Sequence, residues 1–82
     1  MARLSPDQRE VLVVLEANRG VPMRAREIAA VLPPRDYGPT VGLHPRSPEG
    51  VGITLGALVR KGYAFRVRRA GLVWFTLTNP NA

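Results

Sequence analysis

Both ends of a helix are marked in residues 47–62, SPEGVGITLGALVRKG. Ser47 is expected to cap this helix, because its hydroxyl can accept a hydrogen bond from an N–H group of the first turn. Pro48 suits the first helical position, where its missing N–H group costs nothing. Gly62 suits the left-handed residue that closes a helix. The sequence therefore predicts a helix over 48–61.

The two sides of this helix differ in character. Val51, Leu55 and Leu58 recur at intervals of four and three residues, so they form one apolar stripe that is expected to face the core. The opposite side carries Ile53, Ala57 and Arg60. Three interior glycines weaken the helix by about 1 kcal/mol each relative to alanine, which points to a close approach by a partner on that side.

A β-hairpin is expected directly after the helix, over residues 63–78. Its first half alternates apolar and basic residues, which is the period of a strand, and its second half is rich in β-branched and aromatic residues. Ala70-Gly71 supplies the tight turn. The sequence leaves the register open, and with it the face of the hairpin on which Trp74 lies.

Two more helices are expected before residue 47. Ser5 and Gln8 form the two halves of a capping box at the start of a helix over 6–18. A second helix is expected over 24–32, where it is stopped by two prolines. Between these helices, Val21–Met23 is expected to be extended and to form a short third strand at a sheet edge.

The connection 33–47 is long for so small a domain and contains four prolines. It is predicted to be a loop, with a short helix inside it left open, and loops of this length are often functional. Residues 79–82 are expected to be a tail. The whole chain, 1–82, is predicted to be a single α+β domain of three helices and a C-terminal hairpin.

Charge is unevenly distributed along the chain. The net charge is +6, and residues 1–49 hold seven arginines against six acidic residues. Residues 50–82 hold five basic residues and no acidic one. A basic half on a small domain indicates a polyanionic partner, most often nucleic acid, although solubility alone is the alternative explanation.

Several classes of chemistry are excluded or disfavoured. The chain has no cysteine, which excludes disulfides and cysteine metal sites. His44 is its one histidine and lacks an acidic neighbour in sequence, and Gly50-x-Gly52 has no preceding strand, so neither a metal site nor a dinucleotide site is expected. We expect no catalysis and no cofactor. Without a membrane span or a secretory signal, a cytoplasmic location is expected.

The order of predicted elements resembles the winged helix-turn-helix, and within that class the chain is similar to MarR-type and related bacterial regulators. The similarity lies in 4-LSPDQREVL-12, in 26-REIAAVL-32, in the helix that ends at Lys61-Gly62-Tyr63, and in 75-FTLT-78. The chain departs from the family in two ways. The loop 33–46 replaces the usual tight turn, and no long dimerisation helix of the family's kind is expected within residues 1–82.

What the resemblance implies is a regulator that binds duplex DNA with its third helix in the major groove and an arginine-rich wing on the backbone. The expected DNA-binding residues lie in the wing, in the third helix and in the loop before it: Arg66, Arg68, Arg69, Arg60, Lys61, Ile53, Thr54, Gly50, Ala57, Ser47, Arg46 and Arg35. The protein would act as a monomer, a dimer or an oligomer on DNA.

The outward side of the third helix lacks the Asn, Gln and multiple Arg side chains that usually read bases. An alternative is therefore a winged-helix module that binds another protein through the glycine-rich side of this helix.

Overall fold

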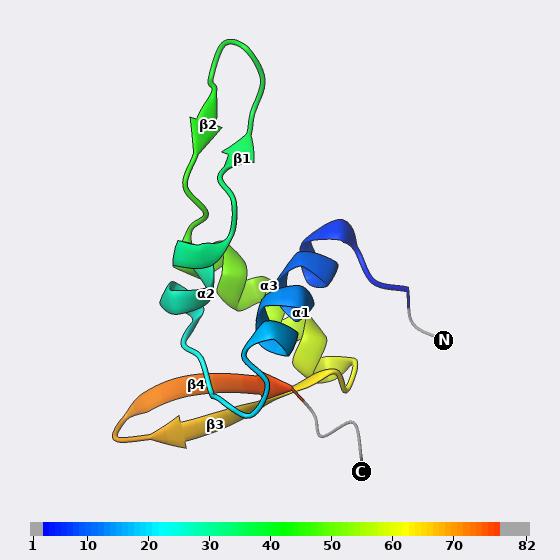
Figure 1. Ribbon diagram of the computed structural model, residues 1–82, viewed down its shortest axis with the longest axis vertical. Helices are drawn as coiled ribbons and strands as arrows, with labels where there is room; N and C mark the ends of the chain where they lie inside the picture. Colours follow the sequence, from blue (N-terminus) through cyan, green and yellow to red (C-terminus); the bar gives the residue numbers. More distant parts are fainter. Residues whose placement is uncertain (1–2, 78–82) are drawn as a thin grey trace.

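The computed structural model describes residues 3–77, which form three helices and two antiparallel hairpins (Figure 1). This architecture confirms the α+β class. The elements are α1 (Pro6–Ala17), α2 (Ala25–Val31), β1 (Arg35–Asp36), β2 (Leu43–His44), α3 (Pro48–Arg60), β3 (Ala64–Arg69) and β4 (Leu72–Leu77).

Local hydrogen bonds set the helix ends where the sequence predicts them. Ser5 and Gln8 form the complete capping box, with the Ser5 N–H donating to Gln8 Oε1 at 3.0 Å and the Gln8 N–H donating to Ser5 Oγ at 3.2 Å. Ser47 Oγ accepts from the Gly50 N–H at 3.0 Å, and Gly62 has a φ of 86°. Helix α2 is shorter than predicted, because Leu32 adopts the extended backbone that a following proline favours.

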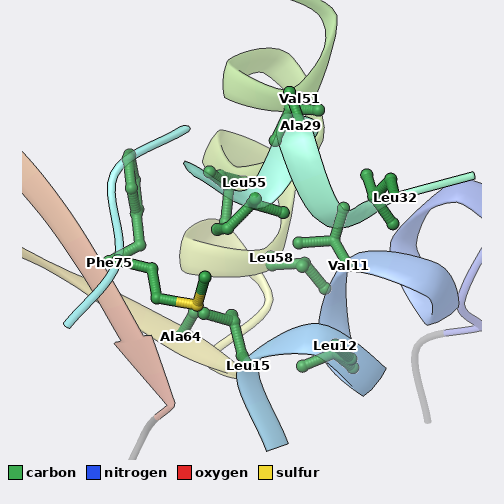
Figure 2. Close-up of a cluster of buried hydrophobic side chains, with 12 residues drawn as sticks. Val11, Leu12, Leu15, Ala29, Leu32, Val51, Leu55, Leu58, Ala64 and Phe75 are labelled. Carbon is green, nitrogen blue, oxygen red and sulfur yellow. The ribbon is translucent and has the colours of Figure 1, made fainter. Parts of the chain in front are cut away.

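The core lies where the three helices meet the C-terminal hairpin (Figure 2). Helix α3 contributes the predicted stripe of Val51, Leu55 and Leu58, all at most 2% exposed. The other members come from α1, α2 and the hairpin: Val11, Leu12, Leu15, Met23, Ile28, Ala29, Leu32, Ala64 and Phe75. Burial of this cluster fixes the hairpin against the helices.

The C-terminal hairpin, β3–β4, is closed by Ala70 and Gly71, which both have positive φ, at 52° and 76°. Two positive φ values in a two-residue loop define a type I′ turn, whose twist matches that of the strands. The predicted third strand is present only as one bridge, in which Met23 and Phe75 exchange both backbone hydrogen bonds. Thr78 and the predicted tail 79–82 lie outside the described residues.

The register settles which face each hairpin residue occupies. Arg66 pairs with Phe75 and Arg68 with Val73, so these four side chains share the face that carries the buried Phe75. Trp74 pairs with Val67 on the opposite, outer face.

The connection 33–47 is not a simple loop, and it contains a hairpin rather than a short helix. Strands β1 and β2 pair antiparallel, with Arg35 opposite His44. We call residues 35–44 the arm. Figure 1 shows that the arm projects from the helices and lies at the other end of the long axis from β3–β4. Within residues 3–77, no helix has the length and apolar character needed to cross a bilayer.

Candidate nucleic-acid interface

Two of the predicted wing arginines lie on the inner face of the C-terminal hairpin, next to the core. Arg66 and Arg68 are both exposed. The Arg66 guanidinium carbon lies 5.8 Å from the centre of the Phe75 ring, which is within the range of a cation–π contact. This contact holds Arg66 over the inner face. Arg69 pairs with Leu72 on the outer face, so the three wing arginines do not form one cluster.

A groove of about 470 Å³ separates the inner face of the hairpin from the first turns of α2 and α3. Val73 and Phe75 line it on the hairpin side, and Glu49 and Gly52 line it on α3. Two further arginines line it on α2, namely Arg24 and Arg26. Arg66 and Arg68 do not line the groove but share the hairpin face of Phe75 and Val73, which do. With Arg24 and Arg26 they outnumber the one carboxylate in the lining, Glu49, and this excess of positive charge suits a phosphate backbone.

The outward side of α3 continues from this groove. Ile53 is 75% exposed, the highest exposure among the large hydrophobic residues of the described chain. Gly52, Gly56 and Arg60 recur every four residues, so they follow one line along the helix, in which Gly56 is buried and Arg60 is exposed. No atom lies within 4 Å of where a Gly52 side chain would start, whereas Arg60 Nη1 would be 3.7 Å from a Cβ on Gly56. The Arg60 side chain thus folds back along the glycines.

The two loop arginines, Arg35 and Arg46, form ion pairs with carboxylates of α1. Arg46 has a side chain only 10% exposed, and its Nη1 donates to Glu10 Oε1 at 3.0 Å while its Nη2 lies 3.7 Å from Asp7 Oδ1. Arg35 also forms an ion pair with Asp7. The hydrogen bond from Arg35 lowers the pKa of the Asp7 carboxyl. Both arginines therefore fasten the arm and the residues after it to α1.

Lys61 is also engaged within the molecule. Its Nζ donates to the Arg3 carbonyl oxygen at 2.8 Å and to Gln8 Oε1 at 2.9 Å. The lysine therefore joins the end of α3 to the start of α1, on the side of α3 away from the groove.

The remaining predicted residues of α3 and its cap do not line the groove beside the hairpin. Ser47, Gly50 and Thr54 instead line a smaller cavity that also includes Asp7 and Arg35. Ser47 caps α3, and Thr54 Oγ1 donates to the Gly50 carbonyl oxygen at 3.2 Å. A Cβ on Gly50 would lie 3.0 Å from Ser47 Oγ, so the glycine leaves room for the cap. Ala57 is half-buried.

Sequence reasoning missed Arg24 and Arg26. The net charge of residues 1–49 is close to zero, because Asp7 and Glu10 offset two of the arginines in the sum. That sum gave no reason to single out Arg24 and Arg26. In the structure those two carboxylates are paired with the arm arginines. We define the basic surface as the five arginines that border the groove and the outward side of α3, which have no carboxylate partner among residues 3–77: Arg24, Arg26, Arg60, Arg66 and Arg68.

Comparison with protein-family models and with characterised proteins found no match to this chain. Within the described residues, no group of three histidine or acidic side chains could hold a metal ion.

Proposed function

We propose that this protein is a winged-helix DNA-binding protein that holds duplex DNA on the basic surface, with α3 in the major groove and β3–β4 as the wing. The observation that carries the proposal is the set of arginines on either side of one groove that are at least partly exposed and have no carboxylate partner among residues 3–77. The order of elements supports it, because α2, α3 and the C-terminal hairpin follow one another as in helix-turn-helix proteins that carry a wing.

Affinity in this proposal comes mainly from phosphates. Arg24 and Arg26 approach the backbone on one side of the groove, and Arg66 and Arg68 approach it on the other. The outward side of α3 offers bases little beyond Ile53, which can contact a thymine methyl group, and Arg60, which can donate to guanine. We therefore expect modest sequence preference and a regulatory or architectural role on DNA.

The test is fluorescence anisotropy with a labelled duplex of mixed sequence, titrated at several salt concentrations. We expect the double variant Arg66→Ala/Arg68→Ala to bind roughly tenfold or more weakly at low salt, because each guanidinium loses a charged hydrogen bond. The slope of log K against log salt should also fall by about 2, since two phosphate contacts are lost.

The matched control is Arg3→Ala/Arg9→Ala, which removes the same charge from exposed positions outside the basic surface. It should leave the salt slope close to that of the wild type. Equal losses in the two double variants would mean that net charge alone drives binding. Absence of wild-type binding at low salt would refute the proposal.

A second function is favoured by one observation, the 75% exposure of Ile53 beside the open backbone of Gly52. An apolar residue next to glycines suits tight contact with another protein. Such a contact should depend little on salt and should be lost in Ile53→Asp. DNA binding by phosphate contacts should instead weaken steeply as salt rises.

A further inference from the structure

The arm carries no net charge in a strongly basic chain, because its two charged residues are Arg35 and Asp36. Residues 37–45, YGPTVGLHP, contain no Asp, Glu, Lys or Arg, although 22% of the chain is charged. The arm exposes Tyr37 at 57%, Val41 at 58% and Leu43 at 65%. Arg35, at the start of the arm, pairs with Asp7, and Arg46, just after the arm, pairs with Glu10. The arm is therefore apolar and electrically neutral, which does not suit a contact with DNA.

The arm is held in a defined shape although little covers it. The Tyr37 N–H donates to the Gly42 carbonyl oxygen at 3.0 Å, and the Gly42 N–H donates to the Gly38 carbonyl oxygen at 2.7 Å. The rings of Tyr37 and His44 meet edge to face, with centres 5.8 Å apart. A two-stranded hairpin is marginal by itself in water, so exposed apolar side chains on it call for a partner surface.

A groove that could accept such an arm lies where the arm joins the helices. A groove of about 600 Å³ runs between α2 and the arm, and its lining is mainly apolar. We call it the arm groove. Its lining includes Ala29, Ala30, Leu32, Pro34, Leu43 and Pro45. Val31, which follows Ala29 and Ala30 at the end of α2, is 61% exposed. Projection and receptor are thus adjacent on one molecule.

We propose that the protein forms a two-fold homodimer in which the arm of each copy packs into the arm groove of the other. An adjacent projection and groove make a self-complementary surface, because a two-fold axis places each arm against the other groove. The ordered backbone of the arm lowers the entropy cost of docking.

Charge favours a second copy as the occupant. Each copy carries +6, so two copies repel wherever their arginines face one another, and they can approach only through a neutral region such as the arm. An acidic protein would instead be drawn to the basic surface. Raising salt should therefore leave the dimer intact or strengthen it, because screening reduces the repulsion.

The dimer leaves four of the five arginines of the basic surface outside the arm groove, since only Arg26 among them lines it. The arm and the C-terminal hairpin lie at opposite ends of the long axis (Figure 1). The arm groove and the groove beside the hairpin share Arg26 and Pro48 at their boundary and otherwise use different residues. A substitution can therefore abolish self-association without abolishing DNA binding, and the reverse.

The test is sedimentation equilibrium of the wild type, Val41→Asp and Val21→Asp at several protein and salt concentrations. Val21 is the matched control, because it is also a valine 58% exposed but lies outside the arm. We expect twice the 9.0 kDa chain mass for the wild type and for Val21→Asp, and the single-chain mass for Val41→Asp. Arg66→Ala/Arg68→Ala should remain dimeric, which separates this proposal from that of DNA binding.

A second measurement avoids any loss of folding. Because the chain has no cysteine, Val41→Cys and Val21→Cys each introduce one thiol whose rate of maleimide labelling can be followed. Labelling at position 41 should slow as protein concentration rises, whereas labelling at position 21 should not. A monomeric wild type at all concentrations, or equal labelling behaviour at the two positions, would overturn the proposal.

Discussion

At the scale of single residues, two positions hold a residue other than the one that their backbone conformation favours. Ala70 has a φ of 52°, in the left-handed region, although it has a Cβ atom. This backbone costs an L-residue about 1–2 kcal/mol, and asparagine tolerates it better than alanine. Gly52 is the opposite case, because it sits in a regular helix with open space where its side chain would be.

Ala70→Asn should stabilise the protein by about 0.5–1 kcal/mol, because asparagine followed by Gly71 is the preferred pair for a type I′ turn. Urea unfolding would measure the change. The reverse effect is expected for Gly71→Ala, since it places a second Cβ at positive φ. A loss of stability in Ala70→Asn would show that the turn does not adopt this geometry in solution.

Gly52→Ala should separate folding from DNA binding. Stability should rise by about 1 kcal/mol, the difference in helix propensity, because nothing obstructs the new methyl group. Affinity for the duplex should fall if DNA lies close to the α3 backbone, and anisotropy would report it. Gly50→Ala is the comparison, since its Cβ would crowd Ser47 Oγ and cancel the gain in stability. Unchanged affinity in Gly52→Ala would exclude a close approach of DNA at this turn.

At the scale of elements, the arm depends on ion pairs with α1. Asp7 forms ion pairs with Arg35 and Arg46, and Arg46 forms a second ion pair with Glu10. The Asp7 side chain is 43% exposed, so solvent screens its pair with Arg35 and the stabilisation is modest. The role of these pairs is to fix where the arm begins and ends relative to α1.

Asp7→Asn should lower the free energy of unfolding at neutral pH. In acid the wild type and the variant should become equally stable. The hydrogen bond from Arg35 lowers the folded-state pKa of Asp7 below its ordinary value of 3.8. The ionised carboxylate therefore stabilises the folded state above the unfolded-state pKa, and this contribution disappears as pH falls through the folded-state pKa.

Urea unfolding at pH 7 and at stepwise lower pH would follow the difference between the wild type and Asp7→Asn. The difference should be constant down to about pH 5 and shrink below it. Glu16→Gln, on the exposed side of α1 and outside the ion pairs of the described chain, serves as the control. A difference that does not depend on pH would contradict a charged interaction at Asp7.

At the scale of the whole molecule, the arm is neutral and the basic surface is positively charged. The arm is neutral because its Arg35 is balanced by acidic residues, while the five arginines of the basic surface have no carboxylate partner in residues 3–77. Salt acts in opposite directions on the two proposed interactions. It should weaken binding to DNA by competing at phosphates, and it should leave the dimer unaffected or strengthened.

The sequence by itself determined the helix ends, the turn of the C-terminal hairpin and the buried stripe of α3. These features depend on hydrogen bonds and spacings within a few residues, such as the capping box of Ser5 and Gln8. A count of charged residues along the sequence also predicted a basic C-terminal half. It could not find the hairpin in 33–47, because strands of two residues leave no periodic pattern.

Only the tertiary structure decided which arginines remain available. Asp7 lies 28 residues from Arg35, and Glu10 lies 36 residues from Arg46, so no local pattern joins them. The register of β3–β4 likewise placed Arg66 and Arg68 on the inner face and Arg69 on the outer one. Both outcomes depend on how distant segments pack around one core, where charges find partners through space and not along the chain.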